Sequence, residues 1–368
     1  MTTVLAGSAD ETSSAGLRTG TSARRVAPDM IVGMTVAPRF KLDLQQGGLI
    51  LIILALCVVL AVFGGSHVDR VTGHSVNNFL NASTLVQILT DASFFAIMAV
   101  GMTAVIVTGG IDLSIGSIYA LAGVGTALVL RSNPTVNPLL GLCLCIGIGL
   151  LAGLLNGTMV AKLGVHPFII TLGTMWIYRG LAFVTSKAES ISVATTITDF
   201  TKANLGLRKD LFPVPALAMV LFAIAGSIWL AKTTWGRRVF AVGGNAEAAR
   251  YAGLKLPQIL AGVYVLTGLA AGLAAFLGSG FYGSASSGDA QGYELYVIAS
   301  AVVGGASLTG GRGSALGATL GALLIVLIRQ SIRTLQLDQN YEWIIIGVAI
   351  IVAVVVDRWS ARAAAKRV

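Results

Sequence analysis

The residue types that usually catalyse reactions or bind metals are few in this sequence and are scattered through apolar stretches. The chain has three cysteines and three histidines, namely Cys57, Cys143, Cys145, His67, His74 and His166. One residue separates Cys143 from Cys145, which is not the spacing of a zinc or redox motif. No histidine lies near a cysteine or aspartate in a metal-binding pattern. The sequence therefore predicts no catalytic residue, no metal site and no cofactor.

Nucleotide-binding chemistry is absent from the sequence as well. The pattern Gly-x-x-x-x-Gly-Lys-Ser/Thr, whose loop holds ATP phosphates in P-loop proteins, does not occur. We therefore expect that this chain does not hydrolyse ATP and is not itself an enzyme.

Composition indicates a membrane protein. Hydrophobic residues make up 55% of the 368, charged residues make up 11%, and the mean hydropathy is +0.83. Soluble domains carry about 25% charged residues, so this chain cannot cover its surface for water. The formal charge of +9 could suggest nucleic acid. However, the basic residues lie between apolar runs, which is typical of the positive-inside rule, so the expected partner is the lipid bilayer.

The apolar runs predict an all-α polytopic membrane protein. A spanning helix needs roughly 20 apolar residues to cross a hydrocarbon core about 30 Å thick. On this basis we predict a bundle of about ten transmembrane helices. The predicted spans are 47–65, 91–109, 114–131, 138–160, 165–185, 212–231, 259–279, 292–309, 315–333 and 341–357. The mildly amphipathic stretch 77–89 is expected to lie along the membrane surface.

Charge predicts the domain organisation and the orientation. Residues 1–46 read as a disordered, basic N-terminal tail without a cleavable signal peptide, 47–357 as the transmembrane domain, and 358–368 as a basic C-terminal tail. The loop 232–258 is rich in lysine and arginine and should be cytoplasmic. Ten spans place both termini and this loop on that same side, so the loops near 66–90, 186–211 and 280–291 face outward.

Glycines at a spacing of four residues predict close helix packing. Gly149 and Gly153, Gly268 and Gly272, and Gly317 and Gly321 form such pairs, which let helix backbones approach closely in membranes.

The most informative loop segment is a predicted short helix. Asn245 can cap a helix over 246–252 and Gly253 can end it. Such a helix has no role in spanning the membrane. It suits docking into a groove of a soluble partner, where Ala248 and Ala249 permit close approach. The alternative is an ordinary basic loop with one helical turn.

The same loop resembles the coupling-helix segment of ABC importer permeases, in the version found for ribose, xylose, arabinose and related monosaccharides. The residues that carry the resemblance, and that would couple the chain to an ATPase, are Gly236, Arg237, Arg238, Asn245, Glu247, Ala248, Ala249 and Gly253. The resemblance implies that this helix seats in a cleft of a cytoplasmic ABC ATPase and passes its closure to the membrane bundle.

Two further stretches resemble the same family. Thr108 to Ser117 contains Gly-Gly-Ile-Asp-Leu-Ser, and 292–313 resembles the family's penultimate segment; smaller matches occur near Asn156 and Arg179. Candidate residues of a translocation path or gate are Asp112, Ser114, Ser117, Asn156, Arg179 and Glu294. The alternatives are that Asp112 only caps a helix, that Arg179 extends to the interface, and that Glu294 lies in water.

The resemblance implies the permease subunit of an importer that moves a monosaccharide across the bacterial inner membrane by alternating access. It implies a partner ATPase, a periplasmic or lipid-anchored sugar-binding protein and a second permease copy in a homodimer. An ABC permease for branched-chain amino acids is an alternative. An ion-coupled secondary transporter is another, although only Asp112, Arg179 and Glu294 emerge as intramembrane ionisable residues, fewer than such coupling usually needs.

Overall fold

The described part of the chain consists almost entirely of helices. The computed structural model describes residues 44–68, 73–203, 213–349, 351–352 and 355, which all belong to one unit. The predicted N-terminal tail lies outside this part except for residues 44–46, and the C-terminal tail 358–368 lies wholly outside it.

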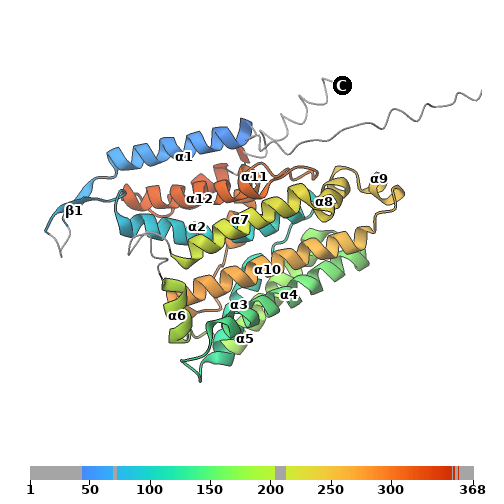
Figure 1. The fold of residues 1–368 in the computed structure, drawn as a ribbon, viewed down its shortest axis with the longest axis horizontal. Coiled ribbons are helices and arrows are strands. Elements are labelled where there is room, and N and C mark those ends of the chain that lie inside the picture. Colours follow the sequence, from blue (N-terminus) through green and yellow to red (C-terminus); the bar gives the residue numbers. More distant parts are fainter. Residues whose placement is uncertain (1–43, 69–72, 204–212, 350, 353–354, 356–368) are drawn as a thin grey trace, which may run out of the picture. The chain divides into compact units, whose positions relative to one another are not determined.

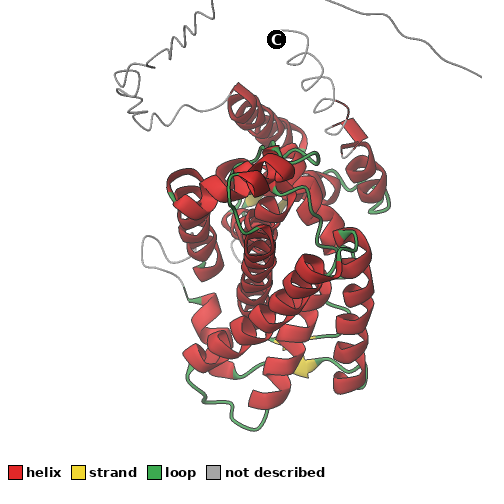
Figure 2. Ribbon diagram, turned by 90° about the vertical axis from the view of Figure 1, so that its right-hand side faces the viewer, coloured by secondary structure: helices red, strands yellow, loops and turns green. Residues whose placement is uncertain are grey.

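The helices are joined mostly by short loops, and two small strand pairs lie among these loops (Figures 1 and 2). The helices are α1 Leu44–Phe63, α2 Ala82–Val107, α3 Ile115–Leu130, α4 Pro138–Leu163, α5 Pro167–Ser186, α6 Thr195–Lys202, α7 Val214–Lys232, α8 Thr234–Gly244, α9 Ala246–Tyr251, α10 Leu256–Tyr282, α11 Tyr293–Val303 and α12 Ala315–Thr334. The strands are β1 Ser66–Val68, β2 Ser75–Asn77, β3 Ile191–Ser192 and β4 Ser284–Ala285. β1 pairs with β2 and β3 pairs with β4, both antiparallel.

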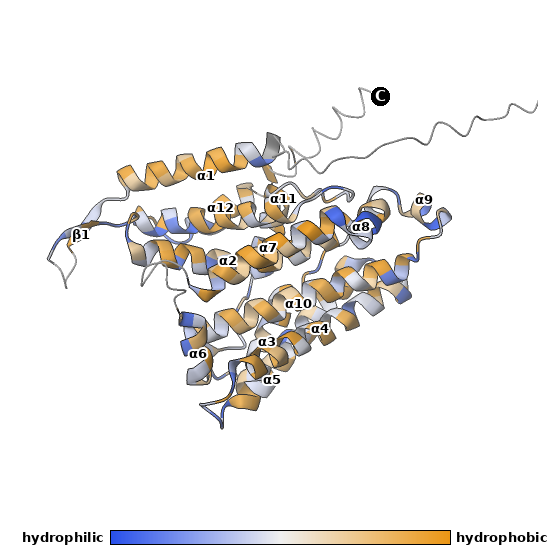
Figure 3. Cartoon of the chain, in the orientation of Figure 1, coloured by the Kyte–Doolittle hydropathy of each residue, from blue (hydrophilic) through white to orange (hydrophobic). Residues whose placement is uncertain are grey.

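The long helices have the length and composition of membrane spans. Among the described residues, seven helices are long and apolar enough to cross a bilayer, namely α1, α2, α4, α5, α7, α10 and α12, while α3 and α11 are shorter apolar helices. Figure 3 shows these helices as predominantly hydrophobic, with hydrophilic residues concentrated near α8 and in the loops. The prediction of an all-α polytopic membrane protein is confirmed. Within the last predicted span, residues 341–349, 351–352 and 355 are helical and the others lie outside the described residues.

The prediction of a surface-lying stretch at 77–89 is wrong. Asn81 begins α2, because its side-chain oxygen accepts a hydrogen bond of 2.8 Å from the backbone N–H of Thr84. The helix then continues without a break from Ala82 to Val107. The mild polarity of this stretch belongs to the first turns of a long span, so α2 starts well before the predicted residue 91.

Contacts near the ends of the helices define two ends of the bundle. At one end the side-chain amide of Gln46 donates to Ser314 Oγ over 2.9 Å, and the N–H of Gly311 donates to the carbonyl of Val107 over 2.8 Å. We call this the coupling end, because the loop 232–256 also lies here. At the far end, β3 after α5 pairs with β4 after α10.

Glycines bring helix backbones into contact, as predicted. A Cβ added to Gly149 of α4 would lie 2.2 Å from the carbonyl oxygen of Gly268 on α10, and one at Gly153 would lie 2.4 Å from that of Tyr264. A Cβ at Gly317 would lie 1.9 Å from the carbonyl oxygen of Gly304. Because no side chain fits in these spaces, α4 packs directly on α10, and α12 packs directly on the end of α11.

Helix α2 lies at the centre of the bundle. It is buried along most of its length and contacts α7, α10, α11 and α12, whereas α1 is largely exposed and contacts α12. The chain segment that follows α2 therefore starts in the middle of the packed helices, where several elements can reach it.

Candidate functional site

The predicted short helix in the basic loop is present as α9. The side-chain oxygen of Asn245 accepts a 2.9 Å hydrogen bond from the N–H of Ala248 and begins the helix. Gly253 follows its end with a φ of +82°, a left-handed conformation that favours glycine. Glu247 and Ala248 are exposed and available to a partner, but Ala249 is buried. The expectation that both alanines face a partner is therefore wrong for Ala249, which packs against the chain's own core.

The loop also contains a second helix, α8, in addition to the one that the sequence predicts. Thr233 caps it, because its hydroxyl accepts a 3.0 Å hydrogen bond from the N–H of Gly236. A Cβ at Gly236 would lie 2.1 Å from the carbonyl oxygen of Leu230, so this glycine allows the tight turn from α7 into α8. Arg237 and Arg238 are both exposed on α8. The Gly-Arg-Arg stretch therefore combines a turn that only glycine permits with two exposed cations.

The end of α8 contacts the segment that follows α2. A Cβ at Gly243 would lie 1.6 Å from the carbonyl oxygen of Val107, the last residue of α2. The same carbonyl accepts the hydrogen bond from Gly311 in the loop before α12. The loop that carries α9 is therefore in direct backbone contact with the break between α2 and α3.

Four of the predicted path residues meet in that break. Oδ1 of Asp112 accepts hydrogen bonds from the N–H of Ser114 at 2.9 Å and from its hydroxyl at 2.6 Å. The side-chain amide of Asn156 on α4 donates to Ser114 Oγ over 2.7 Å, and the Ser117 hydroxyl donates to the Ser114 carbonyl over 2.7 Å. Tyr178 on α5 extends the network, because its hydroxyl donates to Asn156 Oδ1 over 3.1 Å.

This network is fully buried, and one of its atoms lacks a hydrogen bond. Asp112, Ser114, Ser117 and Asn156 have no exposed surface. Asp112 Oδ2 has no hydrogen-bond partner among the described residues. Ser114 occupies the N-cap position of α3 without a side-chain capping bond, while Asp112 accepts from the Ser114 N–H. Asp112 therefore accepts from the N-terminus of α3, and Ser114 in turn connects this segment to Asn156 on α4. A role of Asp112 in a translocation path or gate stays a prediction.

Other helices hold the same segment through the carbonyl of Ile111. It accepts a 3.2 Å hydrogen bond from the Thr171 hydroxyl on α5 and a 3.4 Å one from the Tyr264 hydroxyl on α10. The break between α2 and α3 is thus attached to α4, α5 and α10 at once. A movement of these helices relative to α2 would have to rearrange it.

Arg179 lies under the loop between α10 and α11. It is buried, and its NH1 donates hydrogen bonds of 2.6 Å to the carbonyls of Ser287 and Asp289. The guanidinium is bonded to the backbone of the loop 283–292, and its depth relative to the membrane interface stays a prediction. Arg179 therefore fixes the loop between α10 and α11.

Glu294 and Arg179 lie in the same region without a hydrogen bond between them. Glu294 is half-buried in the first turn of α11, and a Cβ at Gly116 would lie 2.9 Å from its Oε2. The start of α3 covers one side of the Glu294 carboxylate, and the expectation that its other side lies in water stays a prediction.

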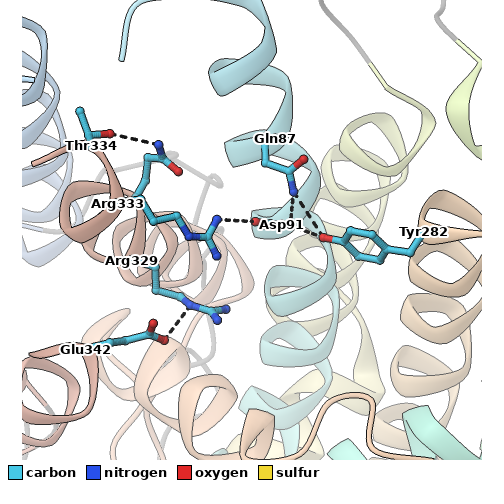
Figure 4. Close-up of polar contacts among 8 residues, drawn as sticks. Gln87, Asp91, Tyr282, Arg329, Arg333, Thr334 and Glu342 are labelled. Carbon is cyan, nitrogen blue, oxygen red and sulfur yellow. Dashed lines mark hydrogen bonds and ion pairs between the residues drawn. The ribbon is translucent and has the colours of Figure 1, made fainter. Parts of the chain in front are cut away.

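A cluster of charged and aromatic residues at the far end was missed (Figure 4). We define the far-end ion cluster by its members from α2, α10, α11, α12 and the last helical segment, which are Gln87, Asp91, Tyr282, Tyr296, Arg329, Arg333 and Glu342. Arg329 Nε lies 2.7 Å from Glu342 Oε1, and Arg333 NH1 lies 3.8 Å from Asp91 Oδ2. The Tyr282 hydroxyl donates to Asp91 Oδ1 over 2.7 Å, and the Tyr296 hydroxyl donates to Glu342 Oε1 over 2.6 Å.

This cluster corrects the count of intramembrane ionisable residues, which included only Asp112, Arg179 and Glu294. Arg329 is largely buried in α12, and its guanidinium lies 5.5 Å from the Phe95 ring and 5.1 Å from the Tyr296 ring. A single arginine does not lower the average hydropathy of an apolar run enough to be noticed. The sequence signal that could have revealed Arg329 is the presence of an acid, Glu342, in the next predicted span, 341–357.

The helical fold, the buried break and the basic loop with its exposed short helix define a polytopic membrane permease. The chain belongs to the family described as the branched-chain amino acid transport system / permease component, which it matches over residues 84–354. Members of this family are permease components, so the chain is a transport subunit and not an enzyme.

Curated relatives within the family carry sugar-transport names. The chain is 34% identical to a fructose import permease protein of Rhizobium meliloti over 86% of this chain and 86% of the relative. It is 35% identical to a ribose import permease protein of Bacillus subtilis, over 76% and 86% of the two chains. It is 33% identical to a D-allose transport system permease protein of Escherichia coli, over 82% and 89%. No solved structure matches the chain significantly.

Proposed function

We propose that the chain is the membrane-spanning subunit of an ABC importer that moves a monosaccharide of the pentose or hexose type across the bacterial inner membrane. The names of the relatives, which include fructose, ribose and allose permeases, support the substrate class. A branched-chain amino acid substrate has the family description in its favour, but none of these relatives carries such a name.

The observation that carries the coupling mechanism is the placement of α9. It is a capped, exposed helix in a basic loop, and the preceding helix α8 contacts the break after α2 at Gly243 and Val107. A cytoplasmic ATPase that binds α9 would act through α8 on the segment that contains Asp112. Closure of the ATPase on ATP would then open the bundle at the far end, and hydrolysis would return it to the opposite state.

The proposed topology is ten spans with both termini in the cytoplasm. It is supported by the seven long helices, by α3 and α11 as two shorter crossings, and by the helical residues after 341. The hydrogen bond between Gln46 and Ser314 places the start of α1 at the coupling end, together with the loop 232–256. The division into a tail (1–46), a permease domain (47–357) and a second tail (358–368) is part of the same proposal.

The partners follow from this role. They are a cytoplasmic ABC ATPase, a periplasmic or lipid-anchored sugar-binding protein and a second copy of the permease. The exposed apolar side of α5, with Trp176, Ile177 and Val184, suits a helix of another membrane subunit. Secondary transport coupled to ions is the alternative function, and the far-end ion cluster is the one observation that favours it.

The ATPase assignment is tested with Glu247→Ala in membranes that contain the ATPase and the binding protein. Because Glu247 is exposed on α9, the variant should insert and fold normally but lose most ATP-driven sugar uptake and ATPase retention on the permease. Glu189→Ala, an exposed acid at the far end, is the matched control. Equal uptake and equal ATPase retention in both variants would refute docking at α9, and sugar uptake driven by an ion gradient without ATPase would favour secondary transport.

A further inference from the structure

A pocket of about 270 Å³ opens at the coupling end between the start of α8 and the start of α10. It is lined by Trp235, Arg238, Gly253, Leu254, Lys255, Gln258 and Ile259. Small-molecule sites usually enclose about 300–1,000 Å³. The pocket is therefore the size of a compact group and too small for a folded peptide segment.

One wall of the pocket is apolar and belongs to the membrane-spanning helices. The Trp235 ring lies against Gly262 of α10, where an added Cβ would be 2.8 Å from ring atom Cζ3. Ile259 is buried beneath the pocket, and Leu254 is half-buried. Tryptophan at this position is typical of the boundary between hydrocarbon and headgroups, because its ring is apolar and its N–H is polar.

The other wall is cationic and is not neutralised. Arg238 and Lys255 are exposed at the rim. The ion pairs in the described ranges are Arg329 with Glu342 and Arg333 with Asp91, all in the far-end ion cluster. Within the loop 232–258 the sequence contains one acid, Glu247, and it is not part of the pocket lining. The pocket therefore offers two positive charges without an internal counter-ion.

The position of the pocket along the chain places it at the membrane boundary. Span α7 ends at Lys232, three residues before Trp235, and span α10 begins at Leu256, two residues before Gln258. The pocket thus lies where two spans leave the apolar layer. A ligand can enter it from the headgroup region and leave its apolar part against α10.

We propose that this pocket binds the phosphodiester headgroup of an anionic phospholipid from the leaflet at the coupling end. Arg238 and Lys255 would contact the phosphate, Gln258 would hydrogen-bond to the headgroup, and Trp235 and Ile259 would contact the upper acyl chain. The lipid-site proposal depends on the proposed topology for the identity of the leaflet. In that topology the coupling end faces the cytoplasmic leaflet, where anionic lipids attract basic residues. A bound lipid would fix the start of α8, and with it the base of the loop that carries α9.

The test measures lipid retention on the full-length, delipidated permease without any ATPase. Phosphatidylglycerol and phosphatidylcholine are added in equal amounts, and bound lipids are counted by native mass spectrometry. Wild type should prefer phosphatidylglycerol. In the double variant Arg238→Gln/Lys255→Gln, the ratio of bound phosphatidylglycerol to bound phosphatidylcholine should fall about thirty-fold. Each of the two cations near the surface contributes about 1 kcal/mol, and about 1.36 kcal/mol corresponds to a factor of ten.

Matched variants separate this site from general charge. Arg250→Gln removes an exposed cation of α9 that does not line the pocket and should keep the preference. Arg238→Lys/Lys255→Arg keeps both charges and should also keep the preference for phosphatidylglycerol. If Arg238→Gln/Lys255→Gln does not fold, Lys255→Gln alone takes its place in the test. An equal loss in Arg250→Gln and the double variant would overturn the proposal.

Two further outcomes would also overturn it. Displacement of the bound lipid by millimolar inorganic phosphate would identify a site for free phosphate. If the double variant retained lipid normally but failed to bind the ATPase in phosphatidylcholine membranes, the pocket would be a protein contact. Lipid retention is measured without the ATPase, so a negative lipid result does not contradict the proposed docking of the ATPase on α9. Likewise, a failure of the ATPase to dock does not contradict lipid binding in the pocket.

Discussion

At the scale of single residues, Asn156 joins three elements, because its amide both donates and accepts hydrogen bonds. Its amide donates to Ser114 Oγ and its carbonyl oxygen accepts from Tyr178. Asn156→Leu keeps a similar volume but leaves both hydroxyls without these bonds in a buried site. Both hydroxyls keep one other partner, Asp112 for Ser114 and the Ala152 carbonyl for Tyr178. The loss is therefore that of two hydrogen bonds at about 0.5–1.5 kcal/mol each, and we expect Asn156→Leu to lower the stability of the permease by about 1–3 kcal/mol, measured as thermal unfolding in detergent.

A double-mutant cycle with Tyr178→Phe is the control for this prediction. Tyr178 also donates to the Ala152 carbonyl, so Tyr178→Phe has a cost of its own. If the network is coupled, the loss of stability in the double variant should be smaller than the sum of the two single losses by about 0.5–3 kcal/mol. Strictly additive losses would show that Asn156 and Tyr178 act separately.

Asp289 makes stability depend on pH in the acid range. It lies in the loop between α10 and α11, outside the spans. Burial raises the pKa of Asp289, against the opposing effects of the Ser286 N–H and the Arg179 charge. A raised folded-state pKa means that this contribution to stability is complete below the unfolded pKa of about 3.9 and is lost as the pH rises through the folded value.

Asp289→Asn removes this titration while keeping an oxygen that can accept from the Ser286 N–H. We expect the unfolding temperature of wild type to fall relative to that of Asp289→Asn as the pH is raised from about 4 to neutrality. The measurement is a series of thermal unfolding curves across that range. Parallel curves for the two proteins would show that burial of Asp289 does not govern the pH dependence.

Residue types predicted part of the candidate site. Asp112, Ser114, Ser117 and Asn156 do come together, because the Gly-Gly-Ile-Asp-Leu-Ser stretch had to be a helix break. The fate of Arg179 could not be predicted, since its partners are the carbonyls of Ser287 and Asp289. Backbone carbonyls carry no signal in the sequence, so a buried arginine that bonds to them resembles one that extends to the interface.

At the scale of elements, α8 connects the loop that carries α9 to the break after α2. Gly243 and Gly244 are neighbours in the last turn of α8, yet their surroundings differ. An added Cβ would lie 1.6 Å from the Val107 carbonyl oxygen at Gly243, whereas nothing lies within 4 Å at Gly244. The two positions therefore form a matched pair in one helix.

We expect Gly243→Ala to force α8 away from α2, at a cost of about 1–3 kcal/mol in stability as for other overpacked contacts, and to reduce ATP-driven uptake strongly. Gly244→Ala should be close to wild type, because alanine favours the helix and meets no atom. Unfolding temperature and uptake in reconstituted vesicles measure both effects. Similar behaviour of the two variants would exclude this contact as the route from α9 to the bundle.

Apolar runs in the sequence predict where the helices lie more reliably than where each helix begins and ends. The helix α2 begins at Ala82 and not near 91, because the Asn81 cap starts it and mild polarity does not stop it. The sequence analysis predicts only loop over 234–244, because three glycines and two arginines do not indicate a helix there. The Thr233 cap and contacts with the bundle stabilise α8 in this stretch. Caps and glycine contacts act through geometry that hydropathy does not report.

At the scale of the whole molecule, the proposed orientation depends on which side of the membrane the coupling end occupies. The chain already contains Cys57, Cys143 and Cys145 within helices of the membrane region, where a charged maleimide in water should not reach them. Glu247 on α9 and Glu189 after α5 are exposed and lie at opposite ends. Replacing each in turn by cysteine marks the two ends without removing the native cysteines.

We expect Glu247→Cys to react with a membrane-impermeant maleimide only in inside-out vesicles, and Glu189→Cys only in right-side-out vesicles. The physical reason is the excess of lysine and arginine in the loop 232–258, which is retained in the cytoplasm. Wild-type protein, which should stay unlabelled in both preparations, is the control for the native cysteines. The reverse pattern would invert the topology and place α9 out of reach of any cytoplasmic ATPase. Labelling of both variants from the same side would contradict the proposed topology, in which an odd number of spans separates residue 189 from residue 247.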